Sequence, residues 1–413
     1  MNFNNIKIVK ELKELLKSYL TESFAEDFIK ILNEDSTLLT NQDLNISHLE
    51  KSQIEYELPQ GFNYRISVDK VLTLCAKLLP AEKYFNLMLD LSQLMLFAGE
   101  VSYSLEIAES LLGKLHSNGK HAEFKADANL MISKIYWSQG YWDDCSYFIS
   151  EAMKTFKSIE SEAGLAKCEN LMGTLYGEKG EFDKAQEHLE KALTHLNMKD
   201  DISTRAMIET NLGVINTIRG NHEKAVWNYK NAMERFERLK DNRRLARVYH
   251  NLGMLFCQME KYDDALDEFN KCITISKEMD YLSNCAVAYI GKAYIYTQQK
   301  NAALAEAYTD KAMELAHKIN DTLSIADLYK IKGMIQNNLE NFELSEEMFE
   351  NSIRLNKDFE NRLNEAESSV ELGKLLEKTE RHEEANIYLE SAQNYFKKIN
   401  GQKLTAGLVQ QSI

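Results

Sequence analysis

Small side chains recur every 40 residues along much of this 413-residue chain. Four series keep the spacing over seven positions each, and every member is glycine, alanine, serine or cysteine: Ser133, Gly173, Gly213, Gly253, Ala293, Gly333 and Gly373; Cys145, Ala185, Ala225, Ala265, Ala305, Ser345 and Ala385; Ala152, Ala192, Ala232, Cys272, Ala312, Ser352 and Ala392; Ala126, Ala166, Ala206, Ala246, Ala286, Ala326 and Ala366. A regular period of about 20 to 50 residues predicts a solenoid of similar structural units.

The positions of proline indicate that the units are helical. Both prolines, Pro59 and Pro80, lie near the N-terminal end, and none follows them. Proline interrupts helices, so its absence permits nearly continuous helix with short connections. Within each unit the glycine and the later alanines are expected on two successive helices, named here the A helix and the B helix. Glycine in a helix costs about 1 kcal/mol relative to alanine, so its regular return predicts close packing of the two.

A turn is expected between the two helices of each unit, followed by an aromatic side chain. The turn is recognised at residues 178–185, 218–225, 259–265 and 338–345. The aromatic residues are Trp142, Phe182, Tyr262 and Phe342, and they are expected to fill the gap between neighbouring units.

This arrangement resembles the tetratricopeptide repeat over seven units, roughly residues 126 to 399. The resemblance implies an all-α fold, a right-handed superhelical solenoid of about seven to eight helix-turn-helix repeats with a helical N-terminal region. The period of 40 departs from the usual length of about 34 residues, and the proline common after the B helix is missing. Longer repeats resemble those of cell-polarity adaptors, the maltose-regulator sensor domain, bacterial peptide-pheromone receptors and Rap-type phosphatases.

Two details follow from the repeat. The added residues include Asp201, Asp241, Asp321 and Asn361, which are placed to cap the next A helix. Cys145 and Cys272 occupy positions that are mostly alanine. They are therefore predicted to be buried packing residues rather than chemical groups.

The chain is expected to divide into four regions. Residues 1–80 form a helical module or cap, 81–120 a degenerate pair of helices, 121–400 the seven repeats and 401–413 a C-terminal capping helix. In the first region, helices are predicted at 5–20, 23–35 and 66–79, with an irregular stretch at 47–65 for which a short strand is the alternative.

Three roles are considered for residues 1–80. A cap packed on the first repeats is favoured. The resembled families offer a DNA-binding helix-turn-helix in the pheromone receptors and an effector bundle in the Rap-type phosphatases. Five lysines, no arginine and seven acidic residues in the first 40 positions argue against DNA binding.

Composition excludes several classes of function. The six cysteines form no CxxC pair, which argues against a zinc site or a disulfide framework and favours a reducing, cytoplasmic setting. The N-terminal sequence does not resemble a signal peptide, and no apolar run is long enough to span a membrane. A net charge of −15 disfavours non-specific binding to nucleic acid. No catalytic motif, metal site or phosphate-binding loop is recognised, so neither enzymatic activity nor a cofactor is expected.

The resemblance places a peptide-binding groove on the A helices. Its predicted residues are Asn170, Met207, Thr210, Val214, Thr217, Ile218, Arg247, His250, Met254, Cys257, Gln258, Val287, Ile290, Tyr294, Thr297, Gln298, Asp327, Lys330, Met334, Asn337 and Asn338. Methionines adapt to varied apolar groups, and amides can bind a peptide backbone. Asn211 and Arg247 match only fragments of the carboxylate clamp found in chaperone-binding repeats, so a clamp is not predicted.

A basic segment, residues 235–247, contrasts with the acidic chain. Its cations are expected to stay solvated near a helix C-terminus, where they favour the helix dipole. The alternative is that they steer an acidic partner.

The sequence therefore predicts a protein–protein interaction adaptor that binds a peptide segment of a partner in the groove. The alternative is a peptide-responsive bacterial regulator, in which the repeats control residues 1–80. The sequence determines neither the partner's identity nor the oligomeric state.

Overall fold

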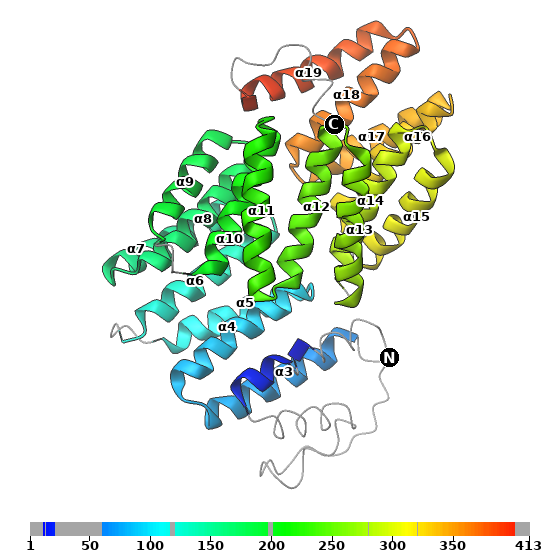
Figure 1. The fold of residues 1–413 in the computed structure, drawn as a ribbon. Helices are drawn as coiled ribbons and strands as arrows, with labels where there is room; N and C mark the ends of the chain where they lie inside the picture. Colours follow the sequence, from blue (N-terminus) through cyan, green and yellow to red (C-terminus); the bar gives the residue numbers. More distant parts are fainter. Residues whose placement is uncertain are drawn as a thin grey trace, which may run out of the picture. The chain divides into compact units, whose positions relative to one another are not determined.

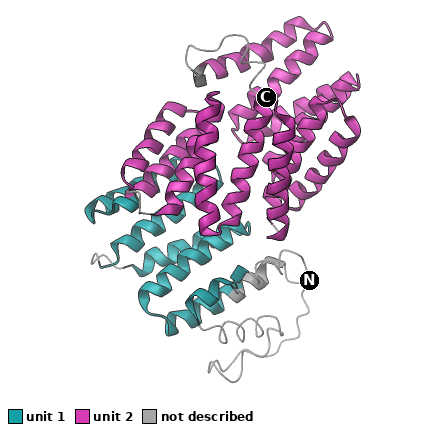
Figure 2. Cartoon of the chain, in the orientation of Figure 1, with its two compact units in different colours: residues 1–164 teal, residues 165–413 magenta. Residues whose placement is uncertain are grey.

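The protein is described by a computed structural model that covers residues 11–12, 14–20, 60–115, 120–196, 201–279, 281–319 and 321–400. It divides into two compact units, residues 1–164 and 165–413 (Figure 2). Every regular element within the described ranges is a helix. The predicted all-α repeat architecture is confirmed.

The described part of unit 1 is helical at residues 11–12 and 14–19 and continues with α3 (Gln60–Leu78), α4 (Ala81–Phe97), α5 (Val101–Lys114), α6 (Ala122–Ser138) and α7 (Trp142–Ser158). Its core gathers apolar side chains from the N-terminal segment and from α3, α4 and α5, among them Leu16, Val68, Leu91 and Leu111. The last pair, α6 and α7, is the first 40-residue repeat.

Helix α8 (Glu162–Glu178) crosses the boundary, and unit 2 continues with α9 (Phe182–Thr194), α10 (Ile202–Ile218), α11 (His222–Leu239), α12 (Asn242–Gln258), α13 (Tyr262–Glu278), α14 (Leu282–Gln298), α15 (Ala302–Lys318), α16 (Thr322–Asn338), α17 (Phe342–Asp358), α18 (Arg362–Lys378) and α19 (His382–Asn400). Even-numbered helices from α6 on are A helices, and odd-numbered ones are B helices. Figure 1 shows the pairs of unit 2 following one another in chain order. From α10 on, each A helix packs on its own B helix and also contacts the A helix of a neighbouring repeat, as α14 does with α12 and α16.

The small residues of the 40-residue series all lie in the core. The alanine, serine and cysteine members are at most 5% exposed, and the glycine members are buried as well. Cys145 and Cys272 are completely buried, which confirms that they serve as packing residues.

The repeating glycine permits contact between the A helix and a large side chain 16 residues later on the B helix. A Cβ added at Gly253 would lie 2.5 Å from Phe269, and one added at Gly213 would lie 2.4 Å from Tyr229. The same closeness recurs between Gly333 and Phe349. These distances are shorter than any van der Waals contact, so only glycine admits the ring.

The capping residues act as predicted. The side chains of Asp201, Asp241, Asp321 and Asn361 each accept a hydrogen bond from the backbone N–H three residues later. Such caps satisfy N–H groups that have no partner within the helix.

The turn between A and B helices has a left-handed residue at a fixed position. It is glycine in the earlier repeats, as at Gly220 (φ 70°), but a charged residue in the later ones: Glu260, Lys300, Glu340 and Glu380. Side chains with a Cβ are strained in this region. Later repeats therefore carry a backbone cost that the earlier ones avoid.

One expectation for the N-terminal region is wrong. Residues 60–65 were predicted to be irregular, yet they begin α3. Gly61 and Asn63 are poor helix formers and weaken the helical pattern there. The helix is stabilised by the apolar face of the following turns, where Val68 and Val71 are buried. The predicted strand before residue 60, the helix at 23–35 and the capping helix at 401–413 lie outside the described residues.

The close A–B contact predicts that Gly253→Ala lowers the free energy of unfolding by about 1–3 kcal/mol, because the buried ring of Phe269 must move. The control is Gly113→Ala, whose added Cβ meets no atom within 4 Å. Because alanine favours the helix, that change should stabilise by about 0.5–1 kcal/mol. Urea unfolding followed by circular dichroism measures both. Equal effects from the two variants would contradict the packing account.

The left-handed turn predicts that Glu340→Gly raises the free energy of unfolding by about 1 kcal/mol, since glycine removes the strain. Gly220→Ala should lower it by a similar amount, although open space surrounds that position. Thermal unfolding of the two variants checks the opposite signs. Stabilisation by Gly220→Ala would show that the turn is not strained.

Candidate functional site

The candidate site is the inner wall of unit 2, defined as the surface formed by α8, α10, α12, α14, α16 and α18. Two observations show that this surface is concave. Glu178 of α8 and Arg247 of α12 are near enough for their charges to attract each other, although the repeat of α10 and α11 lies between them in the chain. Tyr395 of α19 also lines one cavity, of about 230 Å³, together with residues 179–184 of the first turn in this unit. The repeats of unit 2 therefore curve around their A helices.

Polar side chains connect neighbouring A helices along this wall. The Asn211 amide Nδ2 donates hydrogen bonds to Asn170 Oδ1 and Thr174 Oγ1, both at 3.0 Å. The partners stand 41 and 37 residues earlier, which are the two spacings that bring successive A helices into register. Lys378 Nζ donates a hydrogen bond to Asn337 Oδ1 at 3.1 Å, and these two residues are also 41 positions apart. The ladder fixes the side chains and uses part of their bonding capacity.

The C-terminal part of the wall holds charges that neutralise one another. Lys330 Nζ lies 2.6 Å from Glu367 Oε2 and 3.9 Å from Asp327 Oδ1. Burial opposes the charge of Lys330, but these two carboxylates outweigh it and raise the pKa of the ammonium. Asp327 also accepts a hydrogen bond from Asn364, and burial raises its pKa to about 6. Lys374 pairs with Glu371 at 2.7 Å. This region offers few unsatisfied charges to a ligand.

Arg247 differs from these cations. Its side chain is exposed, and within the described part of the chain it makes no hydrogen bond and no ion pair. The surrounding walls crowd the guanidinium and remove water, which lowers its pKa, and Arg244 adds to this effect. Asp241 and Glu178 attract it from a distance. The middle of the wall therefore presents an unneutralised cation.

Three other cations of residues 235–247 are engaged in the structure. Arg235 lies 3.2 Å from Glu209, Arg244 forms an ion pair with Asp241, and the guanidinium of Arg243 lies 4.8 Å from the centre of the Tyr281 ring. Arg238 and Lys240 are exposed at the end of α11, so Arg247 is the cation of this segment on the inner wall.

Beside Arg247, the His250 ring packs 5.8 Å from the ring of Phe269. Its Nδ1 is buried and has no hydrogen-bond partner. Burial lowers the pKa of His250 to about 4, and the positive charge of Arg247 contributes. The imidazole is therefore neutral at neutral pH.

The predicted groove residues fall into two sets. Those that reach the surface wholly or in part are Asn170, Met207, Val214, Ile218, Arg247, His250, Met254, Gln258, Val287, Ile290, Tyr294, Gln298, Asp327, Lys330, Asn337 and Asn338. Those that are buried are Thr210, Thr217, Cys257, Thr297 and Met334. The Thr210 hydroxyl donates to the Ala206 carbonyl, so it bonds its own helix. The buried set contributes to the packing of the wall.

Two wall residues were not among the predicted ones. Glu178 lies at the end of α8, and Asn364 of α18 bonds Asp327. The spacings of 37 and 41 between polar residues were the available signal, since Asn364 follows Asp327 by 37.

No group of three or more metal-binding side chains gathers within the described ranges. All six cysteines are buried, and none of them forms a disulfide. None of the described helices is both long and apolar enough to cross a membrane.

Comparison with known proteins identifies the class. The profile of the tetratricopeptide repeat family matches residues 204–278, and a second profile of that description matches 170–194. The chain therefore contains tetratricopeptide repeats in this region. No curated protein matches the chain by sequence.

Solved structures extend the likeness. A Rap protein complexed with Competence and Sporulation Factor superposes with a TM-score of 0.62 at 15% identity, covering 96% of this chain and 98% of that one. A Rap conjugation gene regulator of plasmid pLS20, in complex with the Phr* peptide, has a TM-score of 0.56 at 14% identity, covering 76% and 96%. The apo form of the quorum sensor NprR from B. thuringiensis has 0.53 at 17%, covering 81% and 94%. At such identities the likeness is one of fold.

The lowered pKa of His250 predicts a pH dependence of stability. The unfolded chain takes up a proton near the ordinary value of 6.5, whereas the folded chain does so only near 4. The contribution of this group to stability is therefore complete above pH 6.5 and declines as the pH falls toward 4. His250→Gln should remove this decline. Urea unfolding of the variant and the parent protein at pH 7.5 and 4.5 tests this prediction. If the two proteins differ in free energy of unfolding by the same amount at both pH values, the prediction is contradicted.

Proposed function

We propose that unit 2 binds a short peptide segment of a partner protein on its inner wall. The observation that carries this proposal is the exposed Arg247 guanidinium, which lacks an anionic partner in a crowded concave surface. A charge that is partly removed from water without compensation is costly. A carboxylate of the ligand would relieve that cost through charge-assisted hydrogen bonds.

The surroundings of Arg247 suit a peptide. Met254, one helical turn past His250, is 37% exposed. Methionine side chains adapt to varied apolar groups. Asn170 and Asn211 keep part of their bonding capacity beyond the ladder, and amides can pair with an extended backbone. The proposed ligand therefore has an acidic residue next to an apolar one.

A second candidate is a peptide-responsive regulator, in which binding on the inner wall alters residues 1–80. The likeness to the Rap protein favours it, because that match covers 96% of this chain and therefore extends beyond the repeats of unit 2. Small-angle scattering with and without a bound peptide separates the two candidates. A change in the radius of gyration supports regulation, and an unchanged curve supports a static adaptor.

The proposal is tested by selecting a displayed library of seven-residue peptides against the full chain. Selected peptides should contain aspartate or glutamate. Arg247→Gln should weaken their binding at least tenfold, because a hydrogen bond to a charged group contributes about 1.5–3 kcal/mol. Met254→Asp should weaken it as well, through repulsion of the acidic peptide. Isothermal titration calorimetry measures both.

The matched control is Arg244→Gln, because Arg244 is already paired with Asp241. It should change binding by less than about threefold, the scale of a surface pair. Failure to select any binding peptide would contradict the proposed function. Binding that tolerates both Arg247→Gln and Met254→Asp would remove the inner wall as the site.

A further inference from the structure

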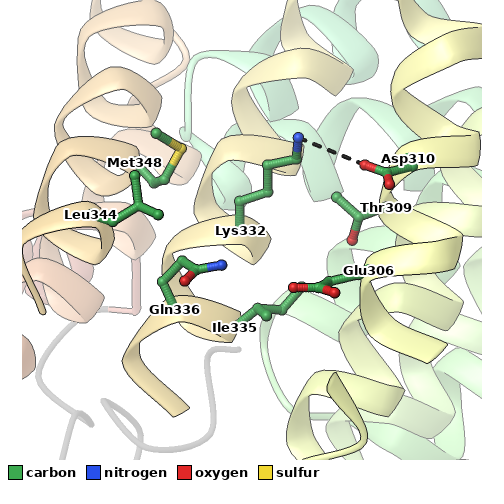
Figure 3. Close-up of a pocket in the computed structure, with 8 residues that line it drawn as sticks. All are labelled: Glu306, Thr309, Asp310, Lys332, Ile335, Gln336, Leu344 and Met348. Atoms are coloured by element: carbon green, nitrogen blue, oxygen red, sulfur yellow. Dashed lines mark ion pairs between the residues drawn. The ribbon is translucent and has the colours of Figure 1, made fainter. Parts of the chain in front are cut away.

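A second surface lies on the opposite side of the repeats. A pocket of about 320 Å³ lies between α15, α16 and α17 and is lined by Glu306, Thr309, Asp310, Lys332, Ile335, Gln336, Leu344 and Met348 (Figure 3). Residues of α16 succeed one another by about 100° around the helix axis. Lys332 and Gln336 are therefore turned away from Lys330 and Asn337, which belong to the inner wall. This pocket is separate from the proposed peptide site.

The pocket coincides with an exception in the repeat. The position 16 residues after the small A-helix residue is large in the other repeats of unit 2: Leu189, Tyr229, Phe269, Phe349 and Leu389. In this repeat it is Thr309, and its A-helix partner is Ala293 instead of glycine. The methyl group of Ala293 occupies space that a ring would need, and the shorter threonine leaves side-chain volume missing in the wall of the pocket.

One residue that lines the pocket, Leu344, and its equivalent one repeat earlier, Leu304, are apolar at a position that is charged in other repeats. Leu304 and Leu344 precede the small residue that begins the B-helix series, and they are 39% and 42% exposed. The equivalent residues of the other repeats are Asp144, Lys184, Lys224, Asp264 and Glu384. Figure 3 shows Leu344 and Met348 on one side of the pocket, facing Glu306, Thr309 and Asp310 across Lys332 and Gln336. Exposed leucine in two consecutive repeats, beside a pocket, marks an interaction surface.

The polar side of the pocket is acidic. Lys332 is the one cation among its lining residues, and its Nζ lies 3.8 Å from Asp310 Oδ1. Glu306 makes no hydrogen bond or ion pair with any residue that the structure describes. Because Lys332 pairs with Asp310, the Glu306 carboxylate is the one that remains for a ligand. A ligand that complements it carries a positive charge.

The geometry points to this pocket as a docking site for a basic amphipathic segment of a partner protein. A leucine, methionine or phenylalanine of the partner enters between Ile335, Leu344 and Met348. A lysine or arginine one helical turn away pairs with Glu306. The volume is at the lower end of the range for ligand pockets, about 300–1,000 Å³, which suits one inserted side chain. The exposed leucines extend the contact beyond the pocket, as a segment requires and a small molecule does not.

The experiment uses the full chain and synthetic twelve-residue helical peptides. Each peptide carries one leucine, methionine or phenylalanine and a lysine or arginine four residues later, and in its matched counterpart glutamate replaces the basic residue. Binding is measured by fluorescence anisotropy. The site is read from the methyl resonance of Met348, assigned through Met348→Leu. Basic peptides should bind and shift this resonance, and their acidic counterparts should bind at least tenfold more weakly.

Three variants test the assignment. Leu344→Lys introduces the residue that the equivalent position has at Lys184 and Lys224, and it should weaken binding at least tenfold. Glu306→Lys should reverse the preference toward the acidic peptides. Ala293→Gly combined with Thr309→Phe recreates the pair formed by Gly333 and Phe349, fills the pocket and should abolish the Met348 shift.

Binding by no peptide, equal binding of basic and acidic peptides, or binding unaffected by Leu344→Lys would overturn the proposal. A self-associated protein that Leu344→Lys dissociates would show that a second copy occupies the surface, and this too would overturn it. These results do not depend on Arg247 or Met254, so the proposal and the proposed function fail independently.

Discussion

The contact between a glycine on the A helix and a large side chain on the B helix holds five of the seven 40-residue repeats together. Phe269 illustrates it, because its ring lies against Gly253 of its own repeat and against Gly291 of the next one. The ring thus joins two repeats at once. Alanine at the other recurring positions keeps the helices close along their length. A stack of this kind gains its stability from each neighbour in turn.

This packing leaves the inner wall free for other tasks. The small residues face the B helices, so the remaining positions of the A helices carry asparagine, methionine and charged groups. The wall divides by electrostatics into a region around Lys330, where charges neutralise one another, and a region around Arg247, where they do not. The pocket beside Thr309 arises from a departure from this packing. Thr309 stands where other repeats of unit 2 have a large B-helix side chain, and Leu344 stands where most repeats have a charged residue.

Much of the fold could be predicted from the sequence, because the small residues are determined by local packing. Their period identified the repeats, the burial of Cys272 and the caps at Asp241 and Asp321. The start of α3 was missed because tertiary packing of Val68 outweighed weak local propensity. The strained turns at Glu260 and Glu340 lack the glycine that would have revealed them.

The site was harder to predict. Family offsets placed the predicted residues on the A helices but did not separate the exposed Arg247 from buried neighbours such as Thr210, because exposure depends on how far each helix rotates in the stack. The absence of an ion pair at Arg247 depends on side chains two repeats away, which no local pattern contains. The pocket beside Thr309 was missed for a related reason, since it arises from a departure from the repeat.

A crystal structure of the full chain with a selected acidic peptide tests the central claim most directly. The account predicts peptide density along α10, α12 and α14, with a carboxylate about 3 Å from the Arg247 guanidinium. Density confined to the B helices, or a peptide on the inner wall that leaves Arg247 without an anionic partner, would contradict it.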